Sequence, residues 1–320
     1  MYFASRLEVL QMSRSGATVI VEMHLPTDRP GVVLRCRIGA NSQDLSRLRR
    51  HVQQNANHRS STWAIASMVL LLAVCGWIVG GAEGLHHAMT GGMPRSNGRA
   101  VSSETMYRLF GAHLLRPPEM PGLFDILADV CSRAHLPRLP ELYCLPASSD
   151  MNAYALGDSE GGAIVLTDGL LRGMTPDEIA GILAHEVAHI RNNDAWAMSW
   201  ATALHRAIEW TSMTGLALLR AQNSGKPNDL PMITLLSAAP AIGQLLCLAL
   251  SRIRESDADA TALELTGDWQ GLVAALDKLE RHHTGSPVLP VAAFEDGQTR
   301  LLRSHPATSE RVGDLLRFAH

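Results

Sequence analysis

The stretch that decides the fold reads Ile182-Leu183-Ala184-His185-Glu186-Val187-Ala188-His189-Ile190. Residues four positions apart on an α-helix lie on one face, one turn apart. The imidazoles of His185 and His189 can therefore converge on one metal ion, with the Glu186 carboxylate beside the first of them. Every other residue of the stretch is uncharged, which predicts a helix that is buried on most of its sides.

The burial of these three polar side chains decides between two interpretations. Without a partner, a buried imidazole or carboxylate loses its hydration at a high cost in free energy. A bound metal ion removes much of that cost, and H-E-x-x-H on a helix is the spacing of zinc peptidases, in which the glutamate is the general base. We therefore interpret His185 and His189 as ligands of one Zn²⁺ ion and Glu186 as the base that activates water.

A third ligand is expected because a catalytic zinc ion usually has three protein ligands and one open position. The segment 251–267 has the pattern of a helix, on which Glu255 and Asp259 lie one turn apart on the same face. Glu255 can ligate the metal, and Asp259 can accept the free ring N–H of a ligating histidine. Taken alone, these residues fit a solvated acidic helix face equally well, and the upstream motif favours the ligand interpretation.

The surrounding pattern predicts an α+β fold that is mostly helical. A capping box at Thr175 and Glu178, with Pro176 at the first helical position, starts the motif helix. Short apolar segments at 142–145 and 163–167 have the pattern of buried strands. We expect a zincin-type metallopeptidase domain with a small β-sheet, preceded by a β-rich N-terminal segment and at least one transmembrane helix.

Composition excludes other classes of protein. The chain has 320 residues and a net charge of −3, with no basic tail, so nothing in it favours a nucleic-acid partner. Its five cysteines include no C-x-x-C pair, so neither a disulfide framework nor a cysteine zinc cage is expected.

One internal segment has the length and polarity of a transmembrane helix. No charged residue occurs from Thr62 to Ala82, which is about the length that a bilayer requires. A buried core helix is the alternative, but core helices are seldom apolar on all sides over this length, so we expect the lipid bilayer as a partner. The expected organisation is a β-rich segment with a basic helix at 1–60, the transmembrane helix at 61–82, a linker at 83–121 and the zinc metallopeptidase domain at 122–320.

Two further apolar segments form an expected helical hairpin within 196–250. Charged residues near the middle of the first segment argue against a lipid-facing span, whereas the second, 231–250, has no charge. His189 and Glu255 must lie on the same side of the membrane if they share a metal ion. Both segments therefore cross or neither does, and we expect a hairpin that lies against the bilayer or dips into it.

Five motifs in sequence order carry a resemblance to a known family. They are Asn152-Ala153-Tyr154-Ala155, Thr167-Asp168-Gly169-Leu170-Leu171, the stretch from Leu183 to Ile190, Arg254-Glu255-Ser256-Asp257-Ala258-Asp259 and Ser304-His305-Pro306-Ala307-Thr308-Ser309-Glu310-Arg311. In these motifs the chain resembles the membrane-associated HtpX-type gluzincin peptidases, relatives of the CAAX prenyl protease. The resemblance covers about 116–317. It departs from the family at 83–100, where a second N-terminal span is usual, and in the first 40 residues.

The resemblance also implies roles for individual residues. His185, His189 and Glu255 would hold zinc while Glu186 activates the water, and an edge strand with Asn152, Ala153 and Tyr154 would bind extended polypeptide substrates by strand addition. His305 is a candidate donor to the oxyanion of the tetrahedral intermediate. A histidine that merely precedes Pro306 at a helix start fits its sequence context as well.

The leading hypothesis is a membrane-anchored zinc metalloendopeptidase that acts on misfolded or membrane proteins, in the inner membrane of a bacterium. A catalytically silent membrane scaffold of the same fold is the alternative, which the intact set of four residues argues against. A zinc hydrolase of non-peptide bonds is a third possibility, which the expected edge strand argues against. Charges before the apolar segment predict an exported catalytic part if there is a single span, whereas the resemblance implies a cytoplasmic one.

Overall fold

The computed structural model describes residues 9–15, 18–24, 33–38, 42–91, 111–221, 229–285 and 311. The chain divides into two compact units, residues 1–56 with 318–320 and residues 57–317. In the first unit, β1 (Val9–Ser15), β2 (Thr18–His24) and β3 (Val33–Ile38) form an antiparallel sheet in that order. These strands confirm the predicted β-rich N-terminal segment.

The second unit contains a mixed sheet of four strands in the order β4-β5-β7-β6. Its strands are β4 (His113–Leu114), β5 (Glu141–Leu145), β6 (Ala153–Leu156) and β7 (Ala163–Thr167). β5 and β7 are parallel, and β6 pairs antiparallel with β7 at one edge of the described sheet. Ala153, Tyr154 and Ala155 of the motif therefore lie on an edge strand of the described sheet, as the family resemblance implies.

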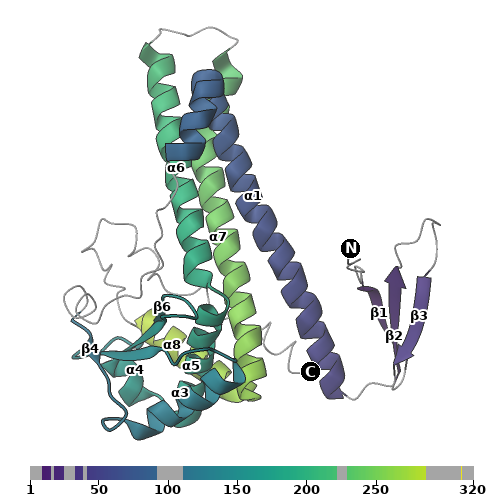
Figure 1. The fold of residues 1–320 in the computed structure, drawn as a ribbon, viewed down its shortest axis with the longest axis vertical. Helices are drawn as coiled ribbons and strands as arrows, with labels where there is room; N and C mark the ends of the chain where they lie inside the picture. The colour runs from purple at the N-terminus through teal and green to yellow at the C-terminus, as the bar shows by residue number, and fades with distance from the viewer. Residues whose placement is uncertain are drawn as a thin grey trace. The chain divides into compact units, whose positions relative to one another are not determined.

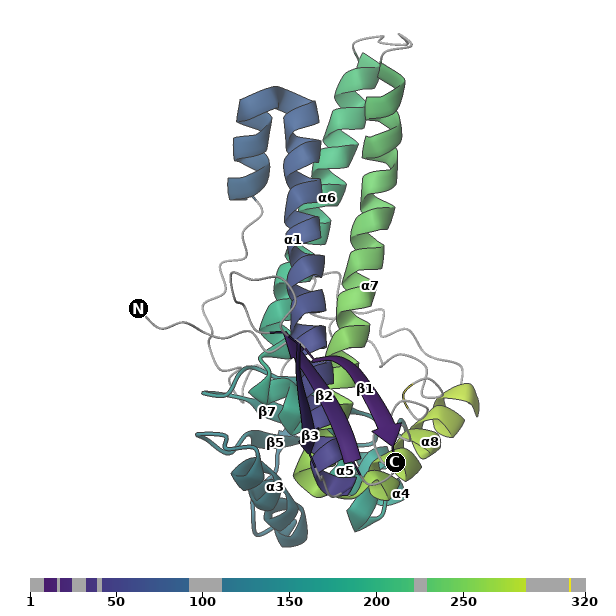
Figure 2. The same cartoon turned by 90° about the vertical axis from the view of Figure 1, so that its right-hand side faces the viewer.

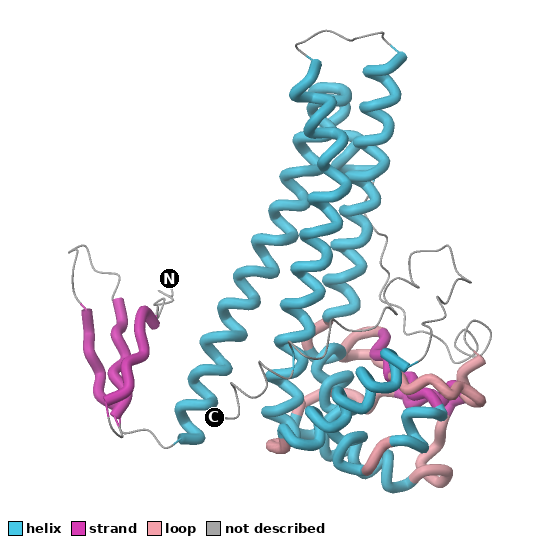
Figure 3. The backbone as a smooth tube through the Cα atoms, turned by 180° about the vertical axis from the view of Figure 1, so that it is seen from behind, coloured by secondary structure: helices cyan, strands magenta, loops and turns pink. Residues whose placement is uncertain are grey.

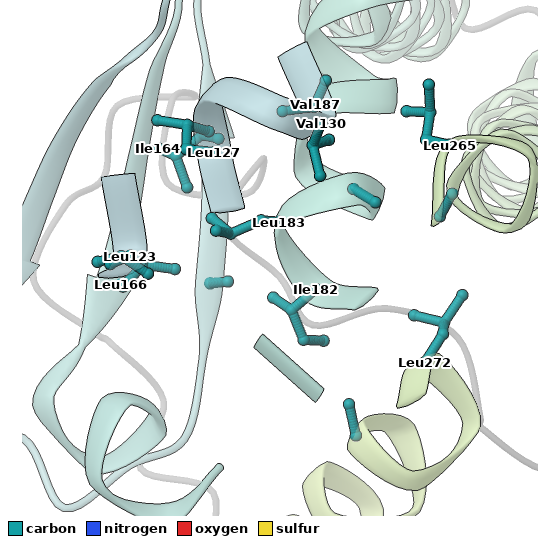
Figure 4. Packing of buried hydrophobic residues seen from close by; sticks show 14 of the residues in the cluster. Leu123, Leu127, Val130, Ile164, Leu166, Ile182, Leu183, Val187, Leu265 and Leu272 are labelled. Carbon is teal, nitrogen blue, oxygen red and sulfur yellow. The ribbon is translucent and has the colours of Figure 1, made fainter. Parts of the chain in front are cut away.

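Helix α5 (Pro176–Arg191) is the central element of the second unit near its sheet. Apolar side chains of α3 (Pro121–Arg133), β7, α7 (Leu230–Thr266) and α8 (Trp269–Gly285) pack against it in one core cluster. Figure 4 shows Ile182, Leu183 and Val187 of α5 among these neighbours. Ten of the sixteen residues of α5 are buried, so the apolar motif predicted the burial correctly. The short helix α4 (Asp168–Gly173) connects β7 to α5.

Long helices extend away from the four-stranded sheet of the second unit. α6 (Asp194–Ala221) and α7 run side by side away from the sheet (Figure 1), and the helices form a tall bundle when they are seen from behind (Figure 3). A second apolar cluster joins α1 (Ser42–Gly91), α6 and α7 through Met68, Ile208 and Leu236. α7 therefore belongs both to this apolar bundle and, through Glu255 and Asp259, to the candidate metal site.

Helix α1 contains a reversal of direction that the sequence analysis did not predict. Gly80 and Gly81 have non-helical backbone angles, and Gly81 has a φ of 59°, which glycine adopts without strain. After them the helix folds back beside its first leg (Figure 2), and a side chain at Gly84 would collide with the carbonyl oxygen of Gly76. Residues 83–91, which we assigned to a linker, are helical for this reason.

Two described stretches are long and apolar enough to cross a membrane, Gln54–Thr90 and Leu230–Thr266. Only 28% and 22% of their most apolar 18-residue parts are buried within the protein. Large apolar side chains such as those of Trp63, Leu70 and Leu245 are therefore exposed, which suits contact with lipid. α7 continues without interruption from its apolar half into the segment that carries Glu255 and Asp259.

Candidate metal centre

The start of α5 is fixed by a complete capping box. The Glu178 amide donates to Thr175 Oγ1 at 3.4 Å, and the Thr175 amide donates to Glu178 Oε2 at 2.7 Å. Lys278 of α8 donates to the same carboxylate oxygen at 2.6 Å. Burial raises the pKa of Glu178, but the bonds from Lys278 and Thr175 outweigh it, so the net pKa is lowered. The N-terminal end of α5 is therefore fixed both by its own capping box and by the contact with α8.

Three side chains from α5 and α7 converge on one point. His185 and His189 lie one turn apart on α5, and their Nε2 atoms are 3.0 Å apart. Glu255 of α7 places its carboxylate oxygens 3.4 Å from His185 Nε2 and 3.6 Å from His189 Nε2. One ligand atom from each lies within 4.8 Å of the others. Two imidazoles and one carboxylate are a donor set that suits a catalytic zinc ion, so the chemistry of these residues fits that metal.

The other ring nitrogen of each histidine faces a carboxylate. His185 Nδ1 lies 3.0 Å from Asp259 Oδ1, and His189 Nδ1 lies 2.7 Å from Asp194 Oδ2. Such contacts fix the ring orientation and turn the Nε2 atom of each histidine towards the candidate metal site. Burial and the Arg311 guanidinium lower the pKa of His185, but hydrogen bonds with Asp259 and Glu255 raise it to about 9.

Asp194 is the first residue of α6 and follows the end of α5 after a short turn. It is only 4% exposed. Asn193, in the left-handed region with a φ of 53°, turns the chain from α5 into α6, and asparagine tolerates that conformation well. This turn brings Asp194, the first residue of α6, next to His189. Arg254 donates a hydrogen bond to the other carboxylate oxygen of Asp194 at 3.3 Å.

Arg311 is a residue that sequence reasoning missed, although it ends one of the quoted motifs. Its Nε donates to Asp259 Oδ2 at 2.8 Å and its Nη2 to Asp259 Oδ1 at 2.6 Å. Its Nη1 lies 3.4 Å from Glu255 Oε2, and the side chain is buried. The positive charge of Arg311 therefore balances two carboxylates at the centre. His305, which we singled out in the same motif, lies outside the described residues.

The candidate substrate strand lies beside α5. The backbone N–H of Asn152 donates a hydrogen bond to Thr167 Oγ1 of β7 at 2.8 Å, and its side-chain Nδ2 donates to the Tyr154 hydroxyl at 2.7 Å. Burial and the charges of Asp150 and Glu186 raise the pKa of Tyr154 to about 12, against a lowering by the Asn152 hydrogen bond. Helix α5, which carries the expected base Glu186, is thus in contact with the candidate substrate strand.

Comparison with known proteins decides the family. Residues 119–319 match the family described as "Peptidase family M48". The chain belongs to peptidase family M48. It is also similar to the "Protease HtpX homolog" of Acaryochloris marina, with 33% identity over 68% of this chain and 78% of the relative. The protein of the same description from Nostoc punctiforme is 32% identical over 78% of this chain and 91% of the relative.

A third relative, the "Protease HtpX homolog" of Burkholderia thailandensis, is 29% identical over 80% of this chain and 94% of its own length. These matches confirm the predicted resemblance to HtpX-type peptidases. With its two apolar helical stretches, this M48 peptidase is a membrane-associated metalloprotease.

Proposed function

We propose that this M48 peptidase is a zinc-dependent endopeptidase that cleaves extended segments of misfolded or membrane proteins. The convergence of His185, His189 and Glu255 on one point supports the proposal. When bound there, zinc would supply a Lewis acid that lowers the pKa of a water molecule and polarises the scissile carbonyl.

Glu186 is the proposed general base. It is only 2% exposed. Because it follows His185 directly on α5, its side chain points about 100° around the helix from that ligand and stays outside the ligand set. Its carboxylate would take a proton from the attacking water and deliver it to the leaving amine. His305 remains our candidate for a second donor to the oxyanion.

The edge strand β6 is the feature that supports the proposal of a peptide substrate. An extended chain that adds to this edge forms main-chain hydrogen bonds with the strand, which do not depend on substrate side chains. Asn152 and Ala153 are the proposed main-chain partners. Tyr154 keeps its phenolic proton at neutral pH, since its pKa is raised to about 12 and even the ordinary value is about 10, so its hydroxyl can donate a hydrogen bond to a substrate at this strand. Unfolded or partly extracted proteins present such extended segments.

The proposed location is the bacterial inner membrane. Its support is the similarity to HtpX homologues of several bacteria together with the two stretches that are long and apolar enough to span a bilayer. A catalytically silent membrane scaffold is the alternative. Retention of both histidines, Glu186 and Glu255 argues against it.

Two variants of the full-length protein in detergent test the proposal. Glu186→Gln should retain zinc, measured by elemental analysis, and lose cleavage of casein. Glu255→Ala should lose zinc, whereas Glu264→Ala, an exposed carboxylate on the same helix, should keep it. Casein cleavage by Glu186→Gln at the wild-type rate would refute the base, and full zinc content in Glu255→Ala would refute the third ligand.

A further inference from the structure

Helix α1 packs against α6 and α7 along a narrow seam. The buried side chains of the described part of its first leg are, in order, those of Asn57, Ser61, Ala64, Met68, Leu72 and Cys75. Their spacing of three or four residues places them on one face of the helix. The apolar members join the second apolar cluster with α6 and α7, so the seam extends from the apolar bundle to the level of the catalytic residues.

The polar end of this seam meets the helix that carries Glu255. Asn57 is 8% exposed, and its Nδ2 donates to Asp257 Oδ1 at 2.6 Å, across 200 positions of sequence. Asp257 is itself 4% exposed. It follows Glu255 by two residues, which is about 200° around the helix. Glu255 therefore faces the histidines while Asp257 faces α1.

The contact continues towards the second histidine. Arg254 precedes Asp257 by three residues on α7, so the two side chains lie next to each other on one face of the helix. Arg254 donates to Asp194 at 3.3 Å, and Asp194 lies 2.7 Å from His189 Nδ1. Arg254 is therefore bonded to the carboxylate that contacts the histidine, and it lies on the same helix face as Asp257, the carboxylate that Asn57 of α1 holds.

We propose that Asn57 is a positioning residue for the metal centre: by holding Asp257 it fixes Arg254, and through it the Asp194–His189 contact. A buried polar contact at the end of a largely apolar seam fixes the register of two helices. Without the Asn57 amide, the buried Asp257 carboxylate loses its neutral donor and recruits Arg254 more fully. Asp194 then loses its cation, and the ring of His189 loses its fixed orientation. The membrane-associated helix thus controls the geometry of the site.

This inference rests on the proposed zinc function, and zinc release is its most direct readout. In the full-length protein, we expect Asn57→Ala to release zinc to a chromophoric chelator about tenfold faster than wild type, the lower end of effects seen when a ligand's support is removed. Its kcat on casein should fall while KM changes little, because Asn57 belongs to α1 and not to the proposed substrate strand β6. Ser61→Ala is the matched control. It lies one turn further along the same seam, and its hydroxyl bonds to the Asn57 carbonyl oxygen of its own helix.

Non-additivity tests the route through Asp194. In an Asp194→Ala background, Asn57→Ala should accelerate zinc release no further, since the contact that it positions is already gone. Equal release rates for Asn57→Ala and Ser61→Ala, or an undiminished effect in the Asp194→Ala background, would overturn the inference. Should Asn57→Ala not fold, Asn57→Gln takes its place with the same expectation, because it keeps the amide but displaces it. A wild-type protein that binds no zinc contradicts the proposed function instead.

Discussion

Arg311 and Asp259 form a buried ion pair with two parallel hydrogen bonds, although they are separated by 52 positions in the sequence. Asp259 in turn contacts His185 Nδ1 at 3.0 Å. The orientation of the first histidine therefore depends on a residue close to the C-terminal end of the peptidase part. Planar, two-bond contacts of this kind are specific to arginine, since lysine offers a single point charge.

Replacement of Arg311 should weaken the metal centre and the fold together. Arg311→Met leaves the Asp259 carboxylate buried without its cation, which costs about 3–5 kcal/mol of stability. Arg311→Lys keeps the charge and should lose less. In both variants we expect a lower zinc affinity in a chelator competition and a lower thermal midpoint. The losses should be larger in Arg311→Met than in Arg311→Lys. Arg191→Met, an exposed arginine at the end of α5, should match wild type, and an unchanged Arg311→Met would contradict this account.

Removal of Asp194 should act on the metal more than on the fold. Asp194→Ala leaves His189 without its acceptor, and loss of such support typically lowers metal affinity about 10- to 100-fold. Asp194→Asn keeps an acceptor oxygen and should fall between the alanine variant and wild type. Zinc titration of the three proteins gives the ranking. Asp177→Ala, an exposed acidic residue of the first turn of α5, serves as the control, and a loss of affinity there would point to a general effect of charge.

The cap of α5 predicts a dependence of stability on pH. Glu178→Gln removes the ion pair with Lys278 and weakens the cap, which should cost about 1 kcal/mol at pH 7. Because the pKa of Glu178 is lowered in the folded protein, its stabilisation is present above the unfolded value of about 4.3 and is lost as the pH falls through the folded pKa. Thermal midpoints of wild type and variant should therefore converge in acid. A constant difference from pH 7 to pH 3 would show that the charge of Glu178 contributes nothing.

The reversal in α1 gives a prediction about packing. An added methyl group at Gly84 collides with the backbone of Gly76, whereas one at Gly80 meets no atom within 4 Å. Gly84→Ala should therefore separate the two legs, lower the thermal midpoint and increase the rate of limited proteolysis. Gly80→Ala should leave both measurements near the wild-type values. If the two variants behave alike, the legs do not pack as closely as the structure shows.

The sequence predicted those parts of the site that depend on local spacing. The cap at Thr175, the pair His185 and His189, and the face shared by Glu255 and Asp259 all follow from helix geometry. Arg311 and the Asn57–Asp257 contact could not be predicted, because they depend on which distant segments meet. Asp194 was visible only as an acidic residue just after the motif helix, and its role required the turn at Asn193.

The errors in the fold have similar physical reasons. Residues 83–91 are rich in polar and small residues, which indicate a linker, but here the glycines allow two helical legs to touch. The polarity of the chain changes sharply after Leu250, which suggested two separate segments within 231–267. Backbone hydrogen bonding continues through that change, so one helix includes both.

The continuity of α7 restricts how its sequence can change in length. A helix is a rigid screw, in which one inserted or deleted residue turns everything beyond it by about 100° and shifts it by about 1.5 Å. A single insertion near Leu245 would therefore leave the apolar half fully apolar and yet rotate Glu255 away from the two histidines. Substitutions among apolar residues are tolerable there, but a change in the number of residues is not. The segment that looks least specific in composition is thus fixed in length by the chemistry at its far end.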